Sequence, residues 1–140
     1  MTYRVVITDS KKRFPSKFGL NELLSAERET NNYNYRSRKM VYSPNKVKKE
    51  GEVICQRCIK KYLKGVRITK PILCTYFIYS PNKEHDRGNV YAGVEKIFLD
   101  SLQKENVISS DGHNFVLDSI FHTLVDKHNP RVEVEIEVIE

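Results

Sequence analysis

Two aspartates flanking one expected helix could together bind a divalent metal ion. Asp86 follows an apolar run and precedes a helix-like pattern, and Asp111 comes after the end of that pattern. A hard cation such as Mg²⁺ uses one or two carboxylates together with phosphate oxygens of the substrate and water. If folding brings the two aspartates together, the pair could hold an ion that activates water for attack on a phosphodiester.

The expected helix carries an apolar face and, offset from it, a polar stripe. The apolar residues recur at helical spacing: Val90, Val94, Ile97, Phe98 and Leu102. The offset stripe consists of Asn89, Gly93, Lys96 and Asp100. Lys96 is therefore a candidate for stabilising negative charge on a phosphate, and Asp100 is a weaker candidate that would orient Lys96.

The same residues also have ordinary structural interpretations. Asp86 and Asn89 are natural N-caps for the helix, and Asp111 is the first residue of an Asp-Gly turn. Lys96 and Asp100 could form only an exposed pair one helical turn apart. Spacing alone leaves both interpretations open.

The order of these residues resembles the RusA family of Holliday junction resolvases, particularly the versions from phages and prophages of Gram-positive bacteria. In that family an Asp-x-Asp-Asn-(Ile/Val/Leu) motif opens a helix, a lysine and an Asp-x-Leu follow on it, and another Asp lies beyond a Gly-Val-Ile-like link. The matching residues are Asp86, Asn89, Val90, Lys96, Asp100, Leu102, Val107, Ile108 and Asp111. The family's N-terminal signature, a Leu-Asn start and an Ala-Glu-Arg helix, is matched by Leu20, Asn21, Ala26, Glu27 and Arg28.

One position departs from the family pattern. Gly88 stands where the family has its second motif aspartate, which belongs to the metal-binding cluster. Three explanations remain open: Glu84 or His85 compensates, the metal is held by Asp86 and Asp111 alone, or the protein binds junctions without cutting them.

The resemblance implies a structure-selective endodeoxyribonuclease that resolves four-way (Holliday) junctions by symmetric nicking in DNA recombination and repair. It implies Mg²⁺ or Mn²⁺ as the cofactor, and a homodimer, because a four-way junction is two-fold symmetric and needs two symmetric nicks. The implied catalytic residues are Asp86, Lys96 and Asp111, with Glu84, Asn89 and Asp100 in support. The alternatives are a junction-binding protein without nuclease activity and a general basic RNA-binding protein.

The charge of the chain also favours a polyanionic partner. The formal net charge is +6, and residues 31–49 interleave tyrosines with basic residues and contain no acid. The candidate DNA-binding residues are Arg28, Arg36, Arg38, Lys39 and Lys46. A solvated loop is the competing interpretation of this segment. A further basic run, from Lys60 to Lys70, is the kind that usually only aids solubility.

The 140 residues are short enough for a single domain, with strands and helices mixed. The patterns predict strands at 3–8, 72–79, 115–125 and 132–138, and helices at 20–29, from 44 to about 64, and from 89 onward. We therefore expect an α+β fold, with a small mixed sheet of about four strands and helices mainly on one face. In the last strand Glu133, Glu135 and Glu137 should form a solvated acidic face that lies away from DNA.

The resemblance implies a bacterial protein, encoded by the cell or by a phage or prophage, and the remaining features favour a cytoplasmic location. No apolar run approaches membrane-spanning length and no signal peptide is visible, so we expect a soluble protein that uses neither a membrane nor an organic cofactor. Cys55 and Cys58 form a CxxC without a second ligand pair at zinc spacing, which predicts core packing for both.

Overall fold

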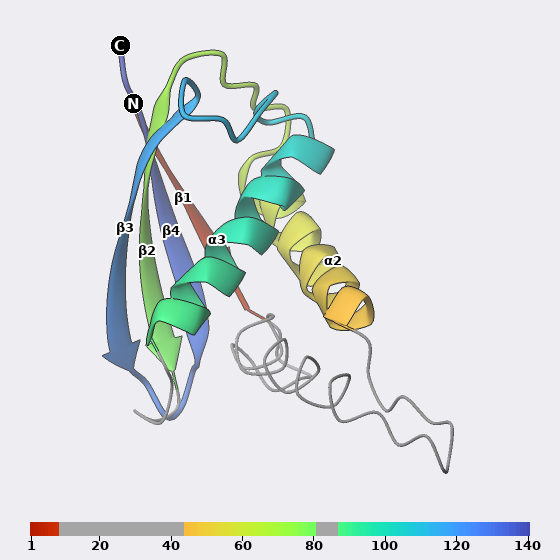
Figure 1. Ribbon diagram of the computed structural model, residues 1–140, viewed down its shortest axis with the longest axis vertical. Helices are drawn as coiled ribbons and strands as arrows, with labels where there is room; N and C mark the ends of the chain where they lie inside the picture. Colours follow the sequence, from red (N-terminus) through yellow and green to blue (C-terminus); the bar gives the residue numbers. More distant parts are fainter. Residues whose placement is uncertain (9–43, 81–86) are drawn as a thin grey trace.

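The computed structural model describes residues 1–8, 44–80 and 87–140, which form one four-stranded sheet and two helices (Figure 1). The elements in chain order are β1 (Thr2–Ile7), α2 (Pro44–Tyr62), β2 (Ile72–Ser80), α3 (Arg87–Lys104), β3 (Val116–Val125) and β4 (Arg131–Val138). The expected α+β class and the four strands are confirmed. The helix expected at 20–29 lies outside the described residues.

The sheet is mixed, with strand order β1-β4-β2-β3. β2 and β3 are parallel, and β4 runs antiparallel to both β1 and β2. Parallel neighbours need a long crossover, and α3 provides it between β2 and β3. Both helices pack on the same face of the sheet, as expected (Figure 1).

This topology gives the sheet two distinct ends. At the helix-start end, the lower end in Figure 1, β2 and β3 end and α2 and α3 begin. At the helix-finish end, α2 and α3 end and β2 and β3 begin.

The core lies between the sheet and the two helices. Alternate residues of β2 are fully buried, and the predicted apolar face of α3 is buried against them. At the centre, the ring of Tyr76 packs edge to face against Phe98 of α3, with the ring centroids 5.7 Å apart. It also stacks on Phe121 of β3, with the ring centroids 4.9 Å apart. Cys55 and Cys58 are buried free thiols in this core, as the sequence predicts.

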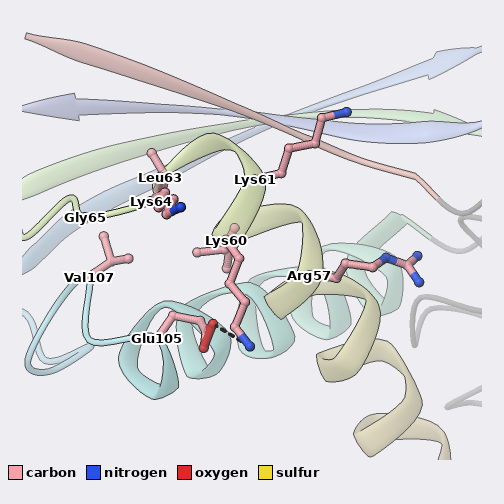
Figure 2. A pocket seen from close by; sticks show the side chains of 9 residues that line it. Arg57, Lys60, Lys61, Leu63, Lys64, Gly65, Glu105 and Val107 are labelled. Carbon is pink, nitrogen blue, oxygen red and sulfur yellow. Dashed lines mark ion pairs between the residues drawn. The ribbon is translucent and has the colours of Figure 1, made fainter.

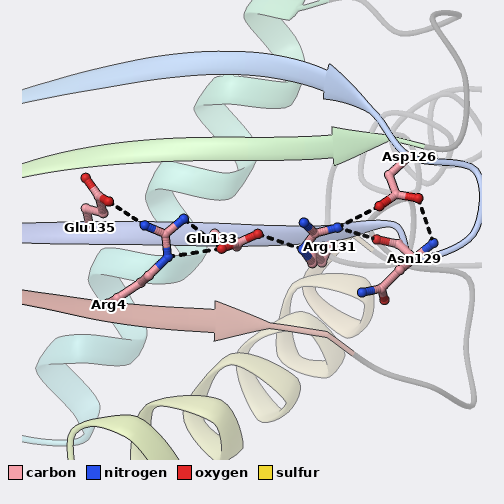
Figure 3. Close-up of polar contacts among 6 residues, drawn as sticks. All are labelled: Arg4, Asp126, Asn129, Arg131, Glu133 and Glu135. Atoms are coloured by element: carbon pink, nitrogen blue, oxygen red, sulfur yellow. Dashed lines mark hydrogen bonds and ion pairs between the residues drawn. The ribbon is translucent and has the colours of Figure 1, made fainter.

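The acidic face of β4 differs from the expectation. Glu133 is 9% exposed and forms two ion pairs: its Oε1 lies 2.7 Å from Arg4 Nη2, and its Oε2 lies 2.7 Å from Arg131 Nε (Figure 3). The prediction of a fully solvated acidic face was therefore wrong at this position. The reason is tertiary, because the alternation in β4 fixes which way Glu133 points, whereas β1 supplies Arg4 from the far end of the chain.

Within the described ranges, no helix combines the length and the apolar character needed to cross a membrane.

Candidate functional site

Several residues that the sequence nominates lie outside the described part of the chain. These are Arg28, Arg36, Arg38, Lys39, Glu84, His85 and Asp86. For Lys46, Gly88 and Asn89, the structure describes helical backbone and no side chain. One local expectation is met, because α3 begins at Arg87, directly after the aspartate that should open a helix.

Lys96 and Asp100 lie on the middle of α3. Lys96 is exposed and Asp100 is half-buried. Lys96 follows Arg87 by nine residues, which at 1.5 Å per residue separates their backbones by about 13 Å along the helix axis.

Asp111 is exposed and lies at the helix-finish end, in the link between α3 and β3. Because β3 is parallel to β2, its first residue, Val116, lies beside Ile72, whereas Ser80 lies at the other end of the sheet. The 18 residues of α3 span about 27 Å between the two ends. Within one chain, the described residues therefore do not bring Asp111 to the start of α3.

The described residues form no cluster of three potential metal ligands. Among them, no three His, Cys, Asp or Glu side chains are grouped so that they could hold one. Near Asp111, His113 is exposed, and the backbone N–H of Gly112 donates to Ser110 Oγ at 3.0 Å, which closes a local turn. Asp111 and His113 are therefore both accessible side chains in the link between α3 and β3.

A different carboxylate lies beside the end of β2. The backbone N–H of Asp126 donates to the carbonyl oxygen of Ser80 at 2.9 Å. The carboxylate of Asp126 accepts the backbone N–H groups of Asn129 at 3.1 Å and His128 at 3.0 Å, and pairs with Arg131 Nη1 at 2.9 Å (Figure 3). These contacts make it the organiser of the β3–β4 turn. The sequence composition indicates a turn at Lys127–Pro130, but it does not show that Asp126, just before that turn, lies beside the end of β2.

A basic pocket lies at the helix-finish end, between the end of α2 and the turn after α3. The pocket has a volume of about 530 Å³, and four cationic side chains line it: Arg57, Lys60, Lys61 and Lys64 (Figure 2). Glu105 also lines it and pairs with Lys60, with Nζ and Oε1 3.4 Å apart. The sequence interpretation of these lysines as merely solubilising did not foresee the pocket, because it is also lined by Glu105 and Val107, which follow α3 in the chain.

No protein-family model matches this chain, and no curated protein matches it by sequence.

Proposed function

We propose that this protein is a metal-dependent endodeoxyribonuclease that nicks four-way DNA junctions, as its resemblance to RusA resolvases implies. The observation that supports the proposal is the position of the motif residues Asp86, Lys96 and Asp111 relative to α3. α3 begins directly after Asp86, Lys96 is exposed on it, and Asp111 lies in the link between α3 and β3. The net charge of +6 supports a DNA substrate.

The residues of the chain have separate roles in this proposal. Asp86 and Asp111 are the proposed ligands of Mg²⁺ or Mn²⁺. Lys96 binds a backbone phosphate and offsets the negative charge that develops on it in the transition state. Its exposed ammonium group is accessible to that phosphate. Asp100, half-buried one turn further along α3, orients Lys96.

The length of α3 has a consequence for the assembly. Arg87, the chain neighbour of Asp86, and Asp111 belong to opposite ends of a helix about 27 Å long. A metal ion bound by both aspartates therefore requires two copies of the chain, in which Asp111 of one copy approaches Asp86 of the other. A two-fold dimer would form two such shared sites, which matches the two symmetric nicks that junction resolution needs.

The first experiment is a nicking assay on a synthetic mobile four-way junction. Purified protein is incubated with the junction in Mg²⁺, Mn²⁺ or EDTA, beside linear duplex of the same sequence. We expect paired symmetric nicks in the junction that require a divalent metal. Equal cutting of linear duplex, or nicks that persist in EDTA, would contradict the proposal.

Mixed dimers test whether the sites are shared. We expect Asp86→Asn and Asp111→Asn each to abolish nicking while leaving junction binding intact, because each removes one proposed ligand and one negative charge near DNA. When the two variants are unfolded and refolded together, a mixed dimer regains one shared site with both native aspartates, so single nicks reappear. If both ligands came from one chain, no mixed dimer would regain activity.

A second candidate, a protein that binds junctions without cutting them, is favoured by Gly88. This residue belongs to the first turn of α3, where the RusA pattern has a metal-binding aspartate. Gly88→Asp separates the two candidates. A gain from undetectable to clear cleavage would show that the natural chain is a binding module, whereas an active natural chain shows that glycine is tolerated here.

The third interpretation, a general basic RNA-binding protein, makes a different prediction. Such a protein would bind four-way DNA, duplex DNA and RNA alike at fixed salt, because the electrostatic attraction to phosphates is common to all three. Competition of these ligands against a labelled junction at one salt concentration distinguishes the interpretations.

A further inference from the structure

The basic pocket at the end of α2 has a strongly one-sided charge. It contains four cations and one carboxylate, which gives it a net charge of +3 at neutral pH. Its cationic side chains come from successive turns at the end of α2 and from the residues that follow. No acidic residue occurs from residue 53 to residue 80, whereas Glu50 and Glu52 lie earlier on α2.

The floor of the pocket strengthens this field. Ile59, Leu63 and Val107 line it and are buried, with exposures of 3% or less. A concave surface of one charge sign over an apolar floor concentrates the electrostatic potential and raises the local concentration of the opposite charge. The pocket is therefore an attractive place for an anion, more so than lysines scattered on a convex surface.

Glu105 balances only part of the charge. Its carboxylate, 13% exposed, lies 3.4 Å from Lys60 Nζ, and the two side chains point toward one another in Figure 2. Lys60 is 71% exposed, so this pair is weak and open to water. Lys61 Nζ lies 5.3 Å from the centre of the Tyr62 ring, a contact that leaves its charge intact.

The layout of the cations indicates the class of ligand. Arg57 and Lys61 are one helical turn apart, or about 6 Å along the axis, and the basic run continues beyond the helix through Arg67 to Lys70. The side chains of Arg57, Lys60 and Lys61 point in different directions in Figure 2, which suits an extended polyanion rather than one small anion, since a small anion needs converging donors. A concave pocket also fits the convex phosphate backbone of a nucleic acid better than it fits a flat lipid surface.

We infer that this pocket is a binding site for the phosphodiester backbone of DNA, additional to the basic segment at residues 31–49 and to Lys96. The inference rests on the proposed function, which makes junction DNA the substrate. The pocket lies at the helix-finish end, the same end as Asp111. DNA held there would contact the protein next to the carboxylate that the proposal places in the shared site.

The test compares the salt dependence of DNA binding among variants of the full-length protein. Binding of a labelled four-way junction and of a linear duplex is measured by fluorescence anisotropy in EDTA, at several salt concentrations. Each phosphate contact contributes about 0.9 to the slope of log affinity against log salt, which corresponds to roughly tenfold in affinity at 50 mM salt. We therefore expect Lys61→Gln with Lys64→Gln to lower the slope by about 2 and to weaken binding by roughly 100-fold.

Two further variants serve as control and as gain of function. Lys127→Gln removes one positive charge from the exposed β3–β4 turn, outside the pocket, and is compared with Lys61→Gln alone: we expect the Lys61 variant to lower the slope by about 0.9 and the Lys127 variant to lower it clearly less. Glu105→Gln removes the one carboxylate of the pocket, and we expect it to tighten DNA binding several-fold at low salt. A gain in affinity cannot arise from misfolding.

The outcomes separate this inference from the proposed function. If the lysine variants keep the natural slope and Glu105→Gln does not bind more tightly, the pocket is not a DNA site, whatever the nicking assay gives. If the natural protein neither prefers nor cuts junctions, the proposed function fails, while a lowered slope on duplex still supports the pocket. Loss of binding to phosphatidylserine vesicles with DNA binding unchanged would assign the pocket to a membrane and overturn the inference.

Discussion

At the scale of single residues, the polar network on the open face of the sheet makes stability depend on acid. Burial alone would raise the pKa of Glu133, but hydrogen bonds from Arg4 and Arg131 more than offset it, so the pKa lies below its ordinary value of 4.5. The backbone N–H of Asn129, Arg131 and the N–H of His128 lower the pKa of Asp126 from 3.8. Each carboxylate therefore holds its proton less tightly in the folded state than in the unfolded state.

The lowered pKa values of Glu133 and Asp126 make the stability of the protein depend on pH. A lowered folded-state pKa stabilises the protein above the ordinary pKa values, and the stabilisation is lost as pH falls through the lowered ones. We expect the free energy of unfolding, measured with urea, to fall between about pH 5 and pH 3. Glu133→Gln should cost about 1–2 kcal/mol at pH 7 and flatten this pH dependence.

Glu137 provides the matched control on the same strand and face. It is exposed, and Glu137→Gln should change neither the stability at pH 7 nor the pH dependence. Equal behaviour of the Glu133 and Glu137 variants would show that the ion pairs of Glu133 contribute nothing to folding.

The cysteines give a second prediction at this scale. Burial raises the pKa of Cys74 to about 12 and raises that of Cys55 further still. Because the thiolate is the reactive form, neither should react with a disulfide reagent in the folded protein near pH 8. Titration with Ellman's reagent should count all three thiols in urea, whereas rapid reaction of Cys55 or Cys74 in native buffer would contradict their placement in the core.

At the level of helices and strands, the sequence predicts the type and approximate bounds of each element that buries only one face. The alternation in β2 and the helical spacing in α3 each follow from one face packed on the core, so their types and approximate bounds were predictable. Strand pairing is different, because a strand–helix–strand order favours a parallel pair but does not show that β2 and β3 are neighbours in the sheet. The 18 residues of α3 carry Asp111 to the helix-finish end, where β3 begins beside the first residue of β2.

Partners from distant elements were equally hidden. Arg4 and Glu133 are 129 residues apart in the chain, and only the β1–β4 pairing makes them neighbours. The basic pocket likewise needs the end of α2 beside Glu105, after α3, which no local pattern encodes. The sequence identifies the charged residues that form the ion pairs and the pocket, but their arrangement in space depends on how the elements pack.

The packing of α3 on the sheet gives the third prediction. Phe98 is fully buried and makes the edge-to-face contact with Tyr76. Phe98→Ala should lower the free energy of unfolding in urea by about 3–5 kcal/mol, because it removes buried surface and leaves a cavity. Phe98→Leu, which fills most of the space, should cost clearly less. Similar losses for both variants would mean that the aromatic contact, rather than the volume, dominates.

At the scale of the whole molecule, the described sheet ends in an edge strand with apolar side chains in solvent. β3 forms this edge, and Leu117, Ile120 and Leu124 on it are each more than a third exposed. An unpaired edge of this kind pairs readily with another strand. If two copies pair antiparallel along β3, the start of β3 in one lies beside the end of β3 in the other.

That pairing brings the two candidate ligands toward each other. Asp111 lies just before the start of β3, and Ser80, which leads to Asp86, lies beside the end of β3 in the parallel neighbour β2. Antiparallel pairing would therefore place the Asp111 link of each copy at the helix-start end of the other. The edge strand and the length of α3 thus favour the same dimer, although they are independent features.

The last prediction tests this dimer directly. We expect light scattering after size exclusion to give twice the chain mass of 16.4 kDa, and Ile120→Lys with Leu124→Lys to give the single-chain mass. Because the shared sites need two copies, these lysine variants should lose nicking while each copy keeps its basic pocket and still binds DNA. Val53→Lys, an equally drastic change at an exposed position on α2, should remain dimeric and active. A β3 variant that is monomeric and still nicks junctions would show that one chain holds a complete site, and the arrangement of Asp86 and Asp111 across two copies would be wrong.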